Sequence, residues 1–84
     1  SKQGEVANEI FFIAKGITRS TVIDHAGEDH TIHFSLEYQF VAEYTSFMLK
    51  VPSTNSIQAI EDTEVVVLPR QVIEWGYKHL AQGD

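Results

Sequence analysis

The stretch Glu9–Lys15, EIFFIAK, is a short run of apolar and aromatic residues that Gly16 brings to an end. A run of this length, bounded by a turn residue, is typical of a buried β-strand. Several neighbouring segments are rich in β-branched residues and are separated by polar turns. The sequence therefore predicts a protein made mainly of short strands.

A β-hairpin is predicted directly after this strand. Thr18–His25 (TRSTVIDH) and His30–Ser35 (HTIHFS) are rich in β-branched residues, and the polar segment Ala26–Asp29 separates them. A polar four-residue connection between two such segments favours a hairpin. The register that gathers the apolar side chains on one face is the one we expect. It pairs His25 with His30, Ile23 with Ile32, and Thr21 with Phe34.

The middle of the chain predicts a strand, a short helix and a loop. Glu37–Val41 (EYQFV) has the composition of a strand. In Ala42–Leu49 the apolar residues recur at a spacing that suits two helical turns. Pro52 marks Lys50–Asn55 as a loop.

The last third predicts two strands and an amphipathic helix. Ser56–Ile60 and Glu64–Leu68 (EVVVL) are the strands. Pro69 suits the first position of a helix, because a helix leaves its first N–H groups unbonded. Gln71–Ala81 then shows helical periodicity. Its apolar stripe consists of Val72, Ile73, Tyr77 and Leu80.

Length and composition limit the class of protein. The 84 residues allow one domain, over residues 1–84, and the many short strands indicate an all-β sandwich, barrel or jelly roll. The chain has no cysteine, which excludes disulfides, iron–sulfur clusters and thiolate zinc sites and agrees with a cytoplasmic location. No apolar run approaches the length of a membrane span.

The charge of the chain argues against contact with nucleic acid by this segment. The formal net charge is −6. A DNA-binding surface needs clustered cations to displace the counterions of the phosphates. The six basic residues are instead scattered singly: Lys2, Lys15, Arg19, Lys50, Arg70 and Lys78.

The order and spacing of these segments resemble the cyclic-nucleotide-binding domains, in particular the sensor half of Crp/Fnr-type bacterial transcription regulators. The resemblance rests on Gly4–Gly16, on the hairpin closing near Gly27, and on three later runs, and it covers essentially the whole chain. It implies a cupin-like, double-stranded jelly-roll β-roll with a short cassette helix and a flanking C-terminal helix. The later runs are Phe40–Glu43, Ser56–Ala59 and Glu64–Leu68.

The resemblance also implies a ligand site around the cassette helix. In the family a Gly-Glu pair opens the cassette, the Glu accepts a hydrogen bond from the ribose hydroxyl, and a later Arg followed by Ser or Thr holds the cyclic phosphate. The ligand-binding residues that this implies here are Ala42, Glu43, Tyr44, Ser53 and Thr54. Glu43 and Thr54 match the family, whereas Ala42 replaces the Gly and Ser53 replaces the Arg.

The missing arginine predicts weak or lost binding of cyclic AMP. Each hydrogen bond to a charged group contributes about 1.5–3 kcal/mol, so losing two costs roughly two to four decades of affinity. The amide groups at the helix start near Ala42 remain as an anion cradle. The effector is then a cyclic nucleotide or another small anion, or the site binds none.

The resemblance implies a larger parent protein. In the family a dimerisation helix and a helix-turn-helix follow the last helix, so the parent would form a homodimer and contact DNA only through a C-terminal domain absent from this chain. We expect Trp75 to pack between the last helix and the roll. We also expect Trp75 and Leu80 to be partly exposed, because the dimerisation helix that would pack beside them is not in this chain.

Two other functional classes stay open beside the sensor. One is a cupin-like metal-binding enzyme, but the imidazoles of His30 and His33 lie three residues apart and should face opposite sides of a strand. We therefore predict no metal site, and no nucleophile–base pair indicates an enzyme. The other class is a ligand-free protein-interaction scaffold. Glu43 would then only stabilise its helix, and Ser53 and Thr54 would be turn residues. A pocket lined by Glu43 would favour the sensor, and a pocket filled by aromatic side chains the scaffold.

Overall fold

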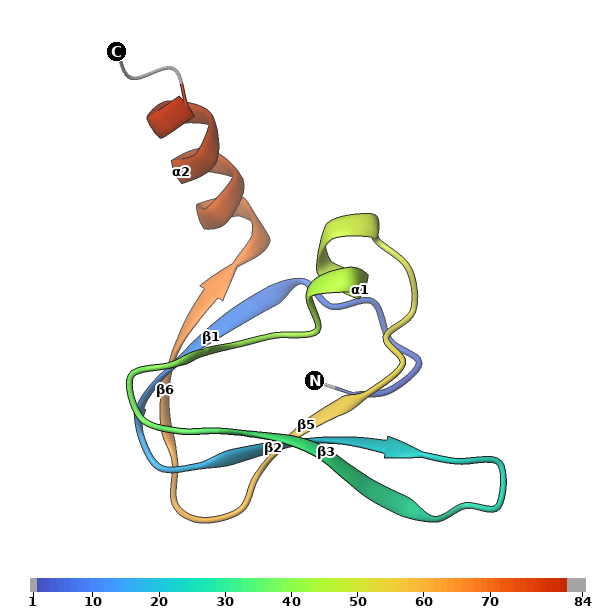
Figure 1. Cartoon of the computed structure of the whole chain (residues 1–84). Helices are drawn as coiled ribbons and strands as arrows, with labels where there is room; N and C mark the ends of the chain where they lie inside the picture. Colours follow the sequence, from blue (N-terminus) through green and yellow to red (C-terminus); the bar gives the residue numbers. More distant parts are fainter. Residues whose placement is uncertain (1, 82–84) are drawn as a thin grey trace.

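Two three-stranded antiparallel sheets face each other in the computed structural model, which describes residues 2–81. The strand orders are β4-β1-β6 and β3-β2-β5 (Figure 1). The helix α1 lies beside the sheets, and α2 projects away from them. The elements in chain order are β1 (Glu9–Lys15), β2 (Thr18–Ile23), β3 (Asp29–Ser35), β4 (Phe40–Val41), α1 (Tyr44–Leu49), β5 (Ser56–Ala59), β6 (Glu64–Pro69) and α2 (Arg70–Ala81).

The predicted strand Glu9–Lys15 is confirmed as β1, the central strand of the first sheet. It pairs along most of its length with β6 and at its middle with β4. The Ile13 side chain is fully buried between the sheets. Gly16 ends the strand with a φ of 107°, a conformation that favours glycine. The mostly β, jelly-roll-like architecture with a C-terminal helix is therefore the one the sequence predicts.

The hairpin is confirmed, but its predicted register was wrong. β2 ends at Ile23 and pairs it with Asp29, so His30 lies opposite Val22 rather than His25. The cause is Asp24, whose Oδ1 accepts hydrogen bonds from the amides of Ala26 and Glu28, 2.9 Å each. These bonds draw residues 24–28 into the turn, so β2 ends two residues earlier than predicted and β3 begins one residue earlier. A bulge at Ile32 then shifts the register once more.

The predicted strand Glu37–Val41 was also largely wrong, because only Phe40 and Val41 are extended. A turn precedes them, in which Tyr38 has a φ of 66° and its N–H donates to the Ile13 carbonyl, 2.7 Å. The left-handed turn directs the aromatic ring outward, and 74% of Tyr38 is exposed. Phe40 is exposed too, so neither aromatic residue belongs to the core.

The helix boundaries differ slightly from the prediction. α1 begins at Tyr44 instead of Ala42, because Glu43 has non-helical backbone angles and caps the helix. Pro69 is the last residue of β6, and α2 begins at Arg70. The predicted apolar stripe of α2 does not pack against the roll: Tyr77 and Leu80 are 78% and 84% exposed.

The prediction that Trp75 packs between α2 and the roll was wrong, because Trp75 is 63% exposed. Its indole stacks on the His79 ring one turn later, with 4.2 Å between the centroids. The expectation that Trp75 and Leu80 remain uncovered is thereby confirmed. Where α2 does meet the body of the protein, the Arg70 guanidinium lies 4.2 Å from the centre of the Phe47 ring.

The core is small and unusually rich in hydroxyl groups. Among residues 2–81, three large apolar side chains are buried, against six serines and threonines. The apolar ones are Ile13, Val41 and Phe47; the hydroxyl residues are Thr18, Ser20, Thr21, Ser35, Ser46 and Ser53. Three of the six belong to β2, the central strand of the second sheet, where an ordinary sandwich carries apolar side chains.

Candidate ligand site

The carboxylate of Glu43 lies at the amino end of α1. Its Oε1 accepts a hydrogen bond from the Thr45 amide at 3.2 Å, so Glu43 is the N-cap of the helix. A carboxylate in this position satisfies an amide that the helix itself cannot bond and favours the helix dipole. Ala42 lies before the cap and outside the helix, so the anion cradle that we predicted near Ala42 already contains a protein carboxylate.

Ser53 and Thr54 belong to the turn that follows α1. Ser53 is only 4% exposed; its Oγ donates to the Asn55 carbonyl at 2.6 Å and accepts from the Asn55 amide at 3.2 Å. The Thr54 hydroxyl donates to Asn55 Oδ1 at 2.8 Å and faces solvent. Both hydroxyl groups thus stabilise the local turn, as serine and threonine commonly do.

The N-terminal segment fixes this turn. The Ser53 N–H donates to the Glu5 carbonyl, and the Ser53 carbonyl accepts from the Gly4 N–H, at 2.8 and 2.7 Å. Ser46 of α1 adds a second connection, because its Oγ accepts from the Ala7 amide at 2.8 Å and donates to the Val51 carbonyl. The segment 4–7, α1 and the turn therefore form one hydrogen-bonded unit.

The five residues that we predicted for the ligand site fall into two groups. Ala42, Glu43 and Tyr44 surround the amino end of α1, and Ser53 and Thr54 follow its carboxyl end. Glu43 makes its hydrogen bond within α1, whereas Ser53 bonds the turn and the N-terminal segment. None of the five positions carries a cationic side chain.

A cavity of about 220 Å³ lies between the two sheets. Thr18 of β2 contributes to its wall, is 4% exposed, and its Oγ1 is the one buried side-chain oxygen or nitrogen in residues 2–81 without a hydrogen-bond partner. Sequence reasoning did not identify this cavity; the available signal was the succession of hydroxyl residues in β2. The lining residues are Phe11, Thr18, Val41, Ile57, Ala59, Thr63 and Val65.

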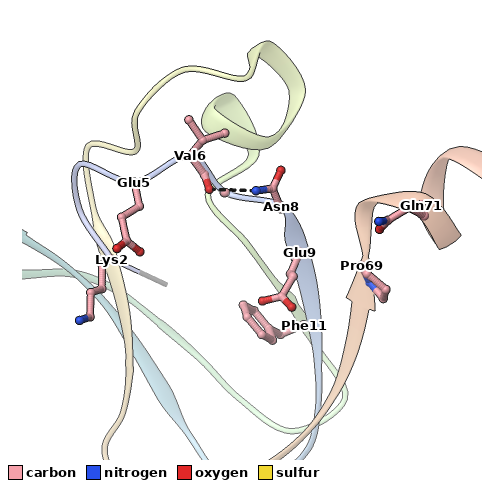
Figure 2. Close-up of a pocket in the computed structure, with 9 residues that line it drawn as sticks. Lys2, Glu5, Val6, Asn8, Glu9, Phe11, Pro69 and Gln71 are labelled. Atoms are coloured by element: carbon pink, nitrogen blue, oxygen red, sulfur yellow. Dashed lines mark hydrogen bonds between the residues drawn. The ribbon is translucent and has the colours of Figure 1, made fainter.

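A second pocket, of about 400 Å³, opens on the surface where the N-terminal segment meets the start of α2 (Figure 2). The side chains of Lys2, Glu5 and Glu9 give it both signs of charge. Arg70 holds two of the lining residues, donating to Asn8 Oδ1 at 3.1 Å and to the Ala7 carbonyl at 2.9 Å. The carboxylates make this pocket a poor place for an anionic effector.

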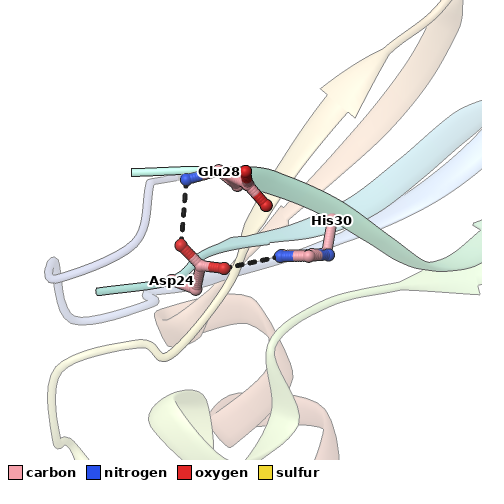
Figure 3. A group of neighbouring side chains, drawn as sticks. All are labelled: Asp24, Glu28 and His30. Atoms are coloured by element: carbon pink, nitrogen blue, oxygen red, sulfur yellow. Dashed lines mark hydrogen bonds and ion pairs between the residues drawn. The ribbon is translucent and has the colours of Figure 1, made fainter. Parts of the chain in front are cut away.

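The hairpin end holds an exposed cluster of Asp24, Glu28 and His30 (Figure 3). The ligand-type atoms of the three lie within 4.8 Å of one another, and His30 Nε2 is 2.8 Å from Asp24 Oδ2. This hydrogen bond from His30, followed by that from the Glu28 amide, lowers the pKa of the Asp24 carboxyl. The hydrogen bonds of Asp24 to the Glu28 amide and to His30 close the turn of the hairpin. This structural role explains why the three residues lie together.

The bulge at Ile32 removes the argument that His30 and His33 face opposite sides of β3. They lie opposite Val22 and Ser20, which are two residues apart and therefore on the same face of β2. That part of the prediction was wrong. His33 is nevertheless occupied elsewhere, with Nε2 3.1 Å from the Ser35 hydroxyl.

Neither helix in the described part of the chain has the length and apolar character that crossing a membrane requires.

Comparison with solved structures shows the fold. The catabolite activator protein of Thermus thermophilus matches with a TM-score of 0.85 and 21% identity, over 95% of this chain and 37% of that one. The sensor domain of the transcriptional regulator DNR from Pseudomonas aeruginosa matches with 0.78 and 18%, over 98% and 52%. The EAL enzyme Bd1971 matches with 0.74 and 14%, over 100% and 71%. The chain thus spans about a third to a half of the first two structures.

Comparison with sequences gives the family. A search of curated proteins found no match. The family model of the cyclic nucleotide-binding domain matches residues 1–79, nearly the whole chain. With two facing sheets, a short capped helix before β5 and a helix after β6, the structure agrees with that match, and the chain belongs to the cyclic nucleotide-binding domain family.

Proposed function

We propose that this chain is the effector-sensing domain of a Crp/Fnr-type transcription regulator and that its affinity for cyclic AMP is weak or lost. The parent protein would be cytoplasmic and homodimeric, and would contact DNA through a separate domain; the chain itself would not be an enzyme. Membership of the family supports a regulatory binding domain. The similarity in fold to a catabolite activator protein and to a regulator's sensor domain supports the parent class.

The observation that supports weak binding of cyclic AMP is the hydrogen bonding of Ser53. It occupies the position at which the family has the phosphate-binding arginine, and its hydroxyl is used within its own turn. An anion beside Ser53 would meet no guanidinium from that position. At the amino end of α1, where the other predicted site residues lie, the Thr45 amide is already bonded to the Glu43 carboxylate. Burying an unpaired phosphate is costly, because its charge loses the stabilisation of water.

Restoring the arginine tests this proposal. We expect Ser53→Arg to strengthen binding of cyclic AMP by about 3 kcal/mol, roughly a hundredfold, because a guanidinium supplies charge-assisted bonds to the phosphate. Titration calorimetry measures the change. Ala14→Arg is the matched control, since it adds the same charge at an exposed position of β1 outside the predicted site and should leave the affinity nearly unchanged.

A companion substitution, Ala42→Gly, should add less than Ser53→Arg, by allowing closer approach of the backbone to the ligand. Equal gains from Ser53→Arg and Ala14→Arg would indicate only general attraction to added positive charge. If neither Ser53→Arg nor the double variant with Ala42→Gly binds cyclic AMP while both keep the circular-dichroism spectrum of the wild type, the proposed site is wrong.

The scaffold alternative has one observation in its favour. A cavity of about 400 Å³ lies between α1 and α2, and the apolar side chains near it are well exposed, among them Met48 and Tyr77. Exposed apolar clusters commonly mark protein interfaces. The cavity between the sheets is not filled by aromatic side chains, so the criterion for the scaffold is not met there. Glu43 does not line this cavity, so the criterion for the sensor is not met there either.

A further inference from the structure

We infer that the groove between α1 and α2 is a binding site for a small anionic amphiphile, a molecule with an apolar tail and one carboxylate. The groove is the cavity of about 400 Å³ that both helices line, and the two helices lie at the same end of the molecule (Figure 1). None of the five residues predicted for the nucleotide site lines it. The inference therefore goes beyond the proposed function and does not rest on it.

The fold gathers positive charge at this groove. The six basic residues are scattered along the sequence, but three of them line the groove: Lys50, Arg70 and Lys78. Glu74 is the single acidic residue of the lining, so the groove has a formal charge of +2. The other three basic and eleven acidic residues of the chain give −8. An anion is thus attracted to the groove and repelled by the rest of the surface.

The two lysines are the cations that remain available to a ligand. Arg70 Nη1 lies 3.9 Å from Glu74 Oε2, and the Arg70 guanidinium lies over the Phe47 ring. Within the described range 2–81, Lys50 and Lys78 form no ion pair. Each ammonium group has three N–H donors, and hydrogen bonds from an ammonium to a carboxylate are stronger than those between neutral groups.

The backbone at Lys50 has a conformation that favours glycine. Lys50 is the C-cap of α1 with a φ of 57°, and its N–H donates to the Ser46 carbonyl at 2.8 Å. Helices commonly end in this left-handed conformation with a glycine, because a residue with a Cβ is strained there. A strained lysine at the edge of a groove points to a role for its side chain in binding.

The rest of the lining is apolar. Phe47 is 4% exposed and Ile73 is half-buried, whereas Met48 and Tyr77 are 71% and 78% exposed. An apolar tail on these side chains would remove hydrophobic surface from water. Methionine adapts its shape to an apolar partner, and lysine can lay its methylene groups along an apolar surface while its ammonium group stays in water.

The volume suits a small molecule. Sites for such ligands measure about 300–1,000 Å³, and the groove, at about 400 Å³, lies near the lower end of this range. A flexible chain with a terminal carboxylate matches the lining, because its tail can follow the apolar side chains while its head reaches the lysines. Decanoate, a straight-chain carboxylate, is therefore a suitable probe.

The test titrates the whole chain with decanoate, below the concentration at which it forms micelles, and follows the backbone amide shifts by NMR. We expect saturable shifts in α1 and α2. Octanoate, which has a shorter tail, should bind roughly tenfold more weakly, because it buries less apolar surface. Decylammonium, which has the same tail and the opposite charge, should produce no saturable shift.

Substitutions in the lining test the two parts of the ligand separately. The double variant Lys50→Gln with Lys78→Gln should weaken decanoate about tenfold by removing both free cations. Lys2→Gln is the matched control, since it removes a positive charge at an exposed position outside the groove and should leave the affinity unchanged. Met48→Ser should weaken decanoate by removing apolar contact with the tail.

A further variant separates binding from folding. Lys50→Gly relieves the strain of the left-handed C-cap and removes the ammonium group. We expect a melting temperature no lower than that of the wild type, together with weaker binding of decanoate. A lower melting temperature with unchanged binding would mean that the Lys50 side chain serves the fold alone, and would contradict its role in binding.

The absence of saturable shifts with decanoate would overturn the inference. Equal binding of decylammonium, or unchanged affinity in the lysine double variant, would do the same. If the amide shifts of α1 and α2 depend on protein concentration in the absence of decanoate, a second copy of the chain occupies the groove and the inference is wrong. Failure of Ser53→Arg to bind cyclic AMP would overturn the proposed nucleotide site and leave this result unaffected.

Discussion

At the scale of single residues, Gly16 shows most directly how the sequence fixes the fold. It joins the two sheets with a φ of 107°, and a Cβ built there would lie 2.5 Å from the Thr63 hydroxyl and 2.9 Å from the Asp62 carbonyl oxygen. Gly27 in the hairpin also has a positive φ, 83°, but a Cβ there would meet open space. The two positions therefore separate backbone strain from steric overlap.

We predict that Gly16→Ala lowers the free energy of unfolding by more than about 2 kcal/mol, whereas Gly27→Ala costs about 1 kcal/mol. Both variants carry the strain of a side chain at positive φ, and only the first also pushes against the backbone of residues 62 and 63. Urea denaturation of the two variants and the wild type measures the difference. Equal losses would show that the close approach at Gly16 does not exist in solution.

The predicted site residues also illustrate the limits of sequence reasoning at this scale. The position of Ser53 in a turn after the cassette helix was predictable from the resemblance and from Pro52. The use of its hydroxyl by Asn55, and of the Glu43 carboxylate by the Thr45 amide, depends on backbone angles that the sequence pattern does not specify. The unpaired hydroxyl of Thr18 was not predictable for the same reason.

At the scale of elements, α1 depends on a tertiary hydrogen bond as much as on its own sequence. A helix of six residues is too short to be stable alone. Ser46, 1% exposed, connects it to the N-terminal segment through the Ala7 amide and to its own following loop through the Val51 carbonyl. Its neighbour Thr45 has an exposed side chain on the same helix.

We predict that Ser46→Ala destabilises the protein by about 2–3 kcal/mol, because it leaves two backbone groups without partners in a region closed to water. Thr45→Ala, with the same kind of side chain removed from the surface, should change the free energy of unfolding by less than about 0.5 kcal/mol. Thermal or urea unfolding checks both. A Ser46→Ala variant as stable as Thr45→Ala would contradict the account of how α1 is held.

The strands were predicted better than the segments between them. β1 and β6 are nearly continuous apolar runs and were found within one residue. The hairpin register failed because Asp24 captured two amides and made the turn longer than its polar residues suggested. The strand at Glu37–Val41 failed because its aromatic residues looked like core residues, whereas a left-handed residue at Tyr38 turns the chain there.

At the scale of the whole molecule, the sequence predicted the architecture and left the location of the ligand undecided. The order of the strands and helices, together with the resemblance, was enough to predict the facing sheets and the C-terminal helix. The position of a cavity depends on how the side chains of the two sheets pack against each other, which the sequence pattern does not specify. The sequence placed the ligand beside α1, and the structure adds a separate cavity between the sheets.

The central claim is that the chain keeps the fold of a cyclic nucleotide-binding domain without its phosphate-binding cation. Calorimetric titration of the unaltered chain with cyclic AMP tests this most directly. We predict no saturation below about millimolar nucleotide, since the missing charge-assisted bonds cost roughly two to four decades of affinity. Saturable binding of one cyclic AMP per chain at about micromolar concentration or below would contradict the claim, because another group would then hold the phosphate.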